Sequence, residues 1–239
     1  MSRTWVLTRF LVRELFASLA GIAPLGAALA FGLIAFEYGM DQAQFITVGG
    51  VGIGAICFLT SLLLAGRADR AASYPLLARL RRRSELLGAI VLGALGITSI
   101  LAVLIAAANL LAGRLTLTWP SLLWILPTWL AFWLFAATLA LSLSLLVSRD
   151  GSNLLGYVLV VGILIAHDRK AALLDRGLVW AVRAVERVLW PVSTLFARAS
   201  DGIHNQTYIL ALGLTLVYTL ICLGISVALF RDKDLLWSE

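Results

Sequence analysis

Residues 86–112 read LLGAIVLGALGITSILAVLIAAANLLA, and no charged side chain interrupts this stretch. About 20 apolar residues in a helix cross the ~30 Å hydrocarbon core of a bilayer. A helix that is apolar on every side has no face to present to water. The stretch therefore predicts a transmembrane helix, and other apolar runs of comparable length are candidates for further ones.

The composition extends this prediction to the whole chain. Hydrophobic residues make up 61% of the 239 residues and charged residues only 13%, whereas soluble domains have about 45–50% and about 25%. The stretches between the long apolar runs are too short for a separate soluble domain. We therefore predict an all-α integral membrane protein, with one transmembrane domain covering residues 1–239.

Six apolar runs are candidates for membrane spans. The fifth is short for a crossing, so we expect it to gain length after His167 or to be partly re-entrant. The predicted spans are 19–36, 45–65, 86–112, 122–147, 153–166 and 208–230.

Arginines between the spans predict the orientation. With the N-terminus inside, the cytoplasmic segments carry nearly all basic residues of the short loops, and the short outer loops carry only Arg114. The positive-inside rule then places both termini in the cytoplasm of a multi-pass inner (plasma) membrane protein. The basic outer segment before the last span opposes this assignment. The inner basic residues are Arg3, Arg9, Arg13, Arg67, Arg70, Arg79, Arg81, Arg82, Arg83, Arg149, Arg231 and Lys233.

Three segments outside the spans have helical patterns. Residues 1–18 place Leu7, Leu11 and Leu15 on one face, which predicts a helix lying in the inner interface. Residues 67–85 form a basic cytoplasmic connector. Residues 168–207 predict an amphipathic outer segment between spans five and six. Its apolar face holds Leu178, Val182, Val185 and Leu189, its basic face holds Arg176, Arg183 and Arg187, and Pro191 is expected to end the helix.

Several function classes lack the residues that they need. The predicted spans contain essentially no ionisable groups apart from Glu37 at the rim of the first, which argues against an ion-coupled carrier or a membrane enzyme. Cys57 and Cys222 form no disulfide framework or metal cluster, and we predict no cofactor. The net charge of +6 is explained by topology and lipid headgroups rather than nucleic acid. No G-x-x-x-x-G-K-[ST] motif is present.

A glycine cluster in the second span has two interpretations. Gly50, Gly52 and Gly54 would either line a substrate path or let neighbouring helices pack closely. Close packing is the more common role of small residues in transmembrane helices, and we favour it.

The connector carries a resemblance to a known family. Residues 67–77 read RADRAASYPLL and residues 81–88 read RRRSELLG. With the N-terminal helix, the segment WPVSTL at 190–195, the exit FRDKDL at 230–235 and the six-span layout, the chain resembles the ABC-2 type transporter permeases.

The resemblance implies a permease that is not itself an enzyme. A separate ATP-binding-cassette ATPase subunit would dock on the N-terminal helix and the connector, and a second permease chain would complete a homo- or heterodimer. The substrate exported would be hydrophobic or amphipathic. The alternatives are a purely topogenic basic loop and, for the whole chain, a non-transporting scaffold subunit of a larger membrane complex. The predicted docking residues are Arg70, Ser73, Tyr74, Leu76, Leu77, Arg81, Arg82 and Arg83.

Overall fold

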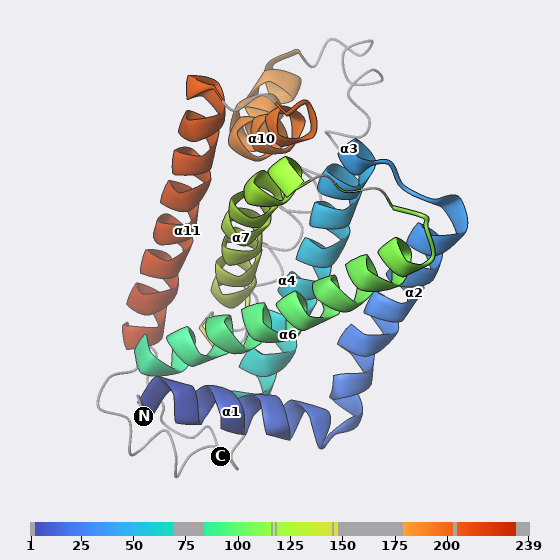
Figure 1. Cartoon of the computed structure of the whole chain (residues 1–239). Coiled ribbons are helices and arrows are strands. Elements are labelled where there is room, and N and C mark those ends of the chain that lie inside the picture. Colours follow the sequence, from blue (N-terminus) through green and yellow to red (C-terminus); the bar gives the residue numbers. More distant parts are fainter. Residues whose placement is uncertain are drawn as a thin grey trace.

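The computed structural model describes residues 3–68, 84–115, 117, 119–144, 146–147, 179–202 and 205–232. These residues form helices joined by short turns, and an isolated bridge between Met40 and Leu115 is the only strand-like pairing among them (Figure 1). The predicted all-helical fold is thus confirmed. The helices are α1 (Arg3–Phe16), η1 (Leu19–Gly21), α2 (Ile22–Tyr38), α3 (Gln42–Gln44), the π-helix η2 (Phe45–Gly49), α4 (Gly50–Ala68), α6 (Ser84–Leu111), α7 (Trp119–Ser142), α10 (Val179–Ser200) and α11 (Gln206–Asp232).

Five helical stretches in the described residues are long and apolar enough to cross a membrane, as expected for a multi-pass membrane protein. They correspond to five of the six predicted spans. The remaining one, 153–166, lies outside the described residues, as does the connector from 69 to 83. The five stretches are Leu19–Tyr38, Gln42–Ala68, Ser84–Leu111, Leu123–Ser142 and Gln206–Phe230.

The central helix of the bundle is α4. It packs against α6 and α7, and also touches α1 and α2, while α11 packs against the far side of α7 (Figure 1). Small residues such as Gly50, Gly54 and Ala65 are buried along α4, so neighbouring helices approach its backbone closely. By contrast, α2 and α11 lie at the periphery and leave most of their length exposed.

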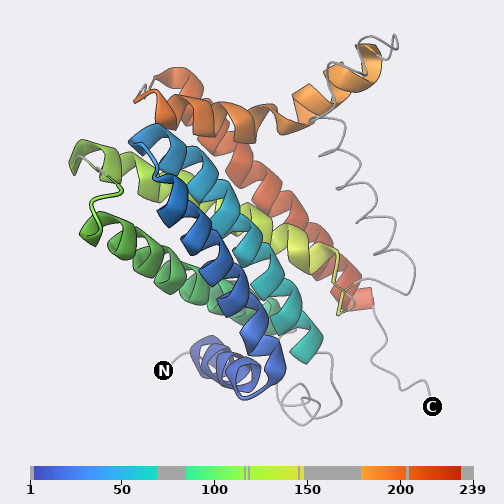
Figure 2. The same ribbon diagram turned by 90° about the vertical axis from the view of Figure 1, so that its right-hand side faces the viewer.

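The bundle has two distinct ends. At one, the α1 end, α1 lies across the end of α4 and the start of α6 (Figure 2). At the other, the α10 end, α10 contacts α3, η2, α7 and α11. Ser142 at the end of α7 bonds to Ser226 near the end of α11, which places both helix ends at the α1 end. Before residues 148–178, α7 therefore ends at the α1 end of the bundle, whereas α10, which follows them, lies at the opposite end.

The predicted end of the fourth span is wrong. The fourth span was expected to continue to 147, but α7 ends at Ser142. Ser144 donates its hydroxyl to the Leu141 carbonyl at 2.7 Å, and its N–H bonds the same carbonyl at 3.0 Å. Serine side chains compete for backbone groups in this way, and the chain tightens into turns.

Pro191 does not end the outer helix, because α10 runs from Val179 through it to Ser200. A proline inside a helix removes one backbone hydrogen bond, a cost of about 3 kcal/mol or more that packing can offset. Leu195, Phe196 and Ala199 are all buried against the bundle and hold the second half of α10 in place. Of the predicted apolar face, Val182 is buried and Val185 and Leu189 are half-buried, whereas Arg183 and Arg187 of the basic face are exposed. Arg176 and Leu178 lie outside the described residues.

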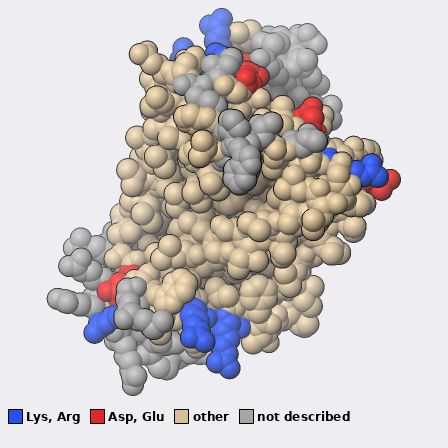
Figure 3. Space-filling view, in the orientation of Figure 1, with Lys and Arg blue, Asp and Glu red and all other residues tan. Residues whose placement is uncertain are grey.

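The outer surface of the bundle is suited to lipid. Charged side chains lie along the margins of the face in Figure 3, and a continuous uncharged surface occupies its centre. Large apolar side chains are exposed on the outside of the bundle, among them Leu29 and Leu33 of α2 and Val103 of α6. In water such a surface would be unfavourable, whereas hydrocarbon accepts it without cost.

Candidate functional site

The first candidate site is the layer that α1 forms across the end of the bundle. Leu7, Leu11 and Leu15 are 6%, 3% and 0% exposed, so they share one face as predicted, and this face packs against the bundle. The position of the helix in the membrane interface stays a prediction. The Thr8 hydroxyl lies 2.9 Å from the Thr4 carbonyl and 3.2 Å from the Ala89 carbonyl of α6. Helix α1 is therefore fixed to α6 by both apolar packing and a polar contact.

The end of α1 is also tied to α4. Arg67, in the last turn of α4, donates from Nη2 to the Ser18 hydroxyl at 2.6 Å. Ala68 and Ser84 are the last described residue of α4 and the first of α6, and they border the connector from 69 to 83. A rigid displacement of α1 would consequently push on both helices that border the connector.

The opposite face of α1 is not covered by any other part of the described chain. Arg9 and Arg13 are exposed, as are Trp5 and Phe16 on the same helix. Basic side chains with neighbouring aromatic rings suit either lipid headgroups or an acidic protein surface. All eight predicted docking residues of the connector lie outside the described residues, so their arrangement relative to α1 stays a prediction.

The glycine cluster of α4 meets aromatic rings from neighbouring helices. A side chain at Gly50 would collide with Phe196 of α10 and lie 2.6 Å from Trp129 Nε1 of α7. At Gly52 it would collide with Phe31 of α2, and at Gly54 with Phe132 of α7. In the described chain the space beside the three glycines is thus filled by rings, an arrangement that favours a helix contact over a substrate path.

Two tryptophans of α7 bond to the backbone where η2 joins α4. Trp129 Nε1 donates to the Ile46 carbonyl at 3.0 Å, and Trp133 Nε1 donates to the Gly50 carbonyl at 3.4 Å. A π-helix widens the turn and often occurs at functional positions. A buried indole N–H needs a hydrogen-bond acceptor, and here the backbone supplies one to each indole without water.

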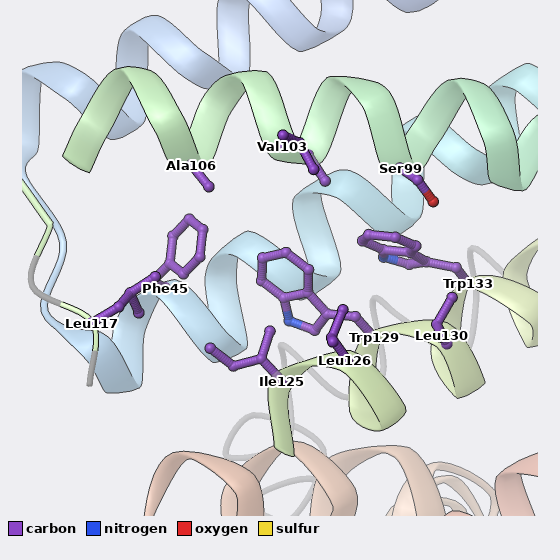
Figure 4. Close-up of a pocket in the computed structure, with 11 residues that line it drawn as sticks. Phe45, Ser99, Val103, Ala106, Leu117, Ile125, Leu126, Trp129, Leu130 and Trp133 are labelled. Carbon is purple, nitrogen blue, oxygen red and sulfur yellow. The ribbon is translucent and has the colours of Figure 1, made fainter. Parts of the chain in front are cut away.

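The second candidate site is an apolar pocket of about 180 Å³ between α6 and α7 (Figure 4). Trp129 stacks at a tilt on both Phe45 and Trp133, with ring centroids 5.1 and 5.4 Å apart. Both helices pack on α4 more extensively than on each other, and this leaves the pocket between them. Its lining residues are Phe45, Ser99, Ala102, Val103, Ala106, Leu117, Ile125, Leu126, Trp129, Leu130 and Trp133.

The interior of the described bundle offers little acid–base or metal chemistry. Charged residues of the five candidate spans occur only near helix ends, as with Glu37, Arg67 and Glu85. Among the described residues there is no group of three His, Cys, Asp or Glu side chains that could hold a metal ion. The polar contacts inside the described spans are made by uncharged side chains: the two indole N–H groups, Asn109, and hydroxyls such as Thr128 and Tyr208, whose oxygens lie 2.9 Å apart.

No family model, curated protein or solved structure matches the chain. The function must therefore be argued from the two candidate sites and from the resemblance noted in the sequence.

The apolar pocket was not predicted from the sequence. One signal was available, because Trp129 and Trp133 are four residues apart and therefore share a face of the helix. Their spacing gives no information about which helices lie opposite. Only the splayed packing of α6 and α7 around α4 creates the hollow.

Proposed function

We propose that this chain is the membrane-spanning permease subunit of an ATP-binding-cassette transporter of the ABC-2 type. A separate ATPase subunit would hydrolyse ATP, and the permease would export a hydrophobic or amphipathic substrate. The observation that carries the proposal is the position of α1. It lies across the end of the bundle and packs on α4 and α6, the two helices that border the basic connector.

This arrangement suits the transmission of force. A partner that binds the exposed face of α1 and the connector would move α1, and α1 would move α6 through Leu7, Leu11 and Thr8. Close-packed helices transmit such displacements because their cores resist compression. The chain would contribute movement, and its partner would contribute the chemistry.

The chemistry of the bundle interior favours this proposal over an ion-coupled carrier. Carriers that use protons or ions need ionisable side chains or broken helices near the middle of the membrane. In the described spans, charged residues occur only near the ends of the helices. Energy from an attached ATPase needs no such groups.

A second permease chain is part of the proposal. Helices α2 and α11 leave most of their apolar surface uncovered. A copy of this chain, or a related permease, would cover one of these faces, with lipid covering the other. Both termini and the α1 end would face the cytoplasm of the plasma membrane, where ATP is available.

Affinity purification of the tagged full chain from its native membranes tests the proposal. We expect an ATPase chain with a G-x-x-x-x-G-K-[ST] motif to co-purify, together with ATP hydrolysis. The double variant R9E/R13E should lose this ATPase, since both arginines lie exposed on α1. The matched control R183E/R187E reverses two exposed arginines of α10 at the other end and should retain it.

A non-transporting scaffold subunit is the second candidate. The first half of α10 extends beyond the bundle (Figure 2), and its Trp180 is 73% exposed. An exposed projecting helix of this kind would suit binding to other membrane subunits. In that case the tagged chain would co-purify with other membrane subunits and no ATPase, and R183E/R187E would be the variant that disrupts the assembly. That pattern would replace the transporter proposal.

A further inference from the structure

We infer that the pocket between α6 and α7 is a binding site for one phospholipid of the zwitterionic, ethanolamine type. One acyl chain would lie along Trp129 and Trp133, and the headgroup would lie at the corner formed by Arg114, Glu37 and Asp41. This inference is independent of the proposed transport function, because a resident lipid site needs neither an ATPase nor a second permease chain.

The pocket opens toward the hydrocarbon. Val103, Leu126 and Leu130 line it and are 66%, 61% and 42% exposed, so they form a rim on the lipid-facing surface. Its floor is made by buried residues, chiefly Phe45, Trp129 and Trp133 (Figure 4). An occupant therefore enters from the side, and only an apolar group matches the lining.

The shape of the pocket suits an extended chain. Ser99 and Ala106 mark its two ends on α6, and seven helical residues rise about 10 Å. A saturated segment of an acyl chain can lie straight along this length beside both indole rings. Ser99 lies at the end of the pocket farther from Arg114, and its hydroxyl would form no hydrogen bond with a methylene chain there.

Apolar burial alone would not hold a lipid here. A chain already surrounded by lipid tails gains no hydrophobic free energy on entering the pocket, so the gain is limited to van der Waals contact. A site that retains one lipid in preference to others therefore needs polar contacts to the headgroup.

Such contacts are available at one end of the pocket. Helix α6 ends at Leu111, and Gly113 has a φ of 67°, a left-handed conformation that glycine adopts without strain. The next residue, Arg114, is exposed, and its guanidinium carbon lies 5.6 Å from the ring centroid of Phe36. Leu117 of the pocket lining is three positions after Arg114 in the chain, so their Cα atoms lie at most about 10 Å apart.

Acidic side chains share this corner. The Arg114 carbonyl accepts the N–H of Met40 at 3.3 Å, which brings Glu37 and Asp41 to the same place in the fold. Both are exposed, and Asp41 is one helical turn before Phe45, whose N–H bonds the Asp41 carbonyl at 2.9 Å. One Asp41 carboxylate oxygen accepts the Gln44 N–H at 2.7 Å, which leaves its other oxygen and Glu37 for an ammonium group. Arg114 can bind the phosphate beside them, so a zwitterionic headgroup fits better than an anionic one.

Photo-crosslinking in lipid nanodiscs tests the site. The probe is phosphatidylethanolamine with a diazirine on one acyl chain, and peptide mass spectrometry locates the label. We expect the label on residues 99–106 of α6 and 125–133 of α7 in clear excess over α11, although α11 leaves more of its length exposed to bulk lipid. Unlabelled phosphatidylethanolamine should compete for the label better than phosphatidylglycerol does.

Two variants at neighbouring positions provide the control. Ala106→Phe places a ring in the pocket, and Ala108→Phe places the same ring on an exposed position of the same helix. Ala106→Phe should lower pocket labelling at least about tenfold, whereas Ala108→Phe should leave it unchanged. Arg114→Gln removes one charge-assisted contact and should lower labelling about fivefold to tenfold. Ser99→Phe serves as a second filling variant if Ala106→Phe does not fold.

Three results would overturn the inference. Equal labelling of the pocket and α11 would mean that only bulk lipid is present. Equal competition by phosphatidylglycerol would remove the zwitterionic headgroup from the proposal. Crosslinks between two copies of the chain at the pocket, without lipid label, would show that a second chain occupies it.

Discussion

At the scale of single residues, Gly50 is a position where three helices meet. It lies on α4 between Trp129 of α7 and Phe196 of α10, and it is buried. Its missing side chain is what allows both rings to reach the α4 backbone. Trp129 has little freedom to move aside, because its Nε1 is bonded to the Ile46 carbonyl.

Gly50→Ala is therefore expected to destabilise the protein by about 1–3 kcal/mol, the usual cost of overpacking. Gly66→Ala on the same helix is the control, since nothing lies within 4 Å of an added Cβ there. That variant should be neutral or more stable by up to about 1 kcal/mol, because alanine favours the helix. Thermal unfolding in detergent compares the two; equal stability would mean that the rings do not press on Gly50.

The indole bonds of α7 allow a second prediction at this scale. Trp129→Phe removes the donor that lies 3.0 Å from the Ile46 carbonyl, and Trp133→Phe removes one at 3.4 Å. Hydrogen bonds inside membranes average about 0.6 kcal/mol and reach about 1.7. We expect the shorter bond to contribute more, so Trp129→Phe should lower the unfolding temperature further than Trp133→Phe. The reverse order would indicate that ring packing, rather than the N–H bond, dominates at these positions.

At the scale of elements, the attachment of α1 to the bundle can be measured directly. Leu11 is 3% exposed in the layer between α1 and α6, whereas Val6 on the other face is 55% exposed. Leu11→Ala should cost about 2 kcal/mol or more of local packing and speed amide exchange throughout α1 at least about tenfold. Val6→Ala should leave the exchange rates unchanged. The measurement is hydrogen–deuterium exchange of residues 3–16. Equal exchange rates in the two variants would contradict the attachment of α1 through Leu11.

The elements also show where local sequence patterns are overridden. The alternation of faces in α1 and in the first half of α10 could be read from the sequence, because burial repeats every three or four residues along a helix. The end of α10 could not be read in this way. Pro191 is a helix-breaking signal, and the buried Leu195, Phe196 and Ala199 override it through contacts with distant helices.

At the scale of the whole molecule, the proposed orientation in the membrane can be tested at the two ends of the bundle. The α1 end carries Arg3, Arg9, Arg13 and Arg67, and by the positive-inside rule we expect it to face the cytoplasm. In a background with Cys57→Ala and Cys222→Ala, exposed Glu14→Cys at the α1 end should react with an impermeant maleimide only after cells are opened. Asp201→Cys, exposed at the α10 end, should react in intact cells. The opposite labelling pattern would invert the topology and remove α1 as a cytoplasmic docking surface.

The amino-acid sequence was enough to predict an all-helical chain, the five helices apolar enough to cross a membrane and the buried leucine face of α1. These features depend on hydropathy and on a period of 3.6 residues, and both are local properties of the chain. The aromatic rings beside Gly50, Gly52 and Gly54, and the divergence of α6 and α7 that leaves a pocket, could be seen only once the helices were placed in three dimensions. The pairing of helices depends on side-chain shapes that meet from distant parts of the chain, and no local pattern encodes which shapes will meet.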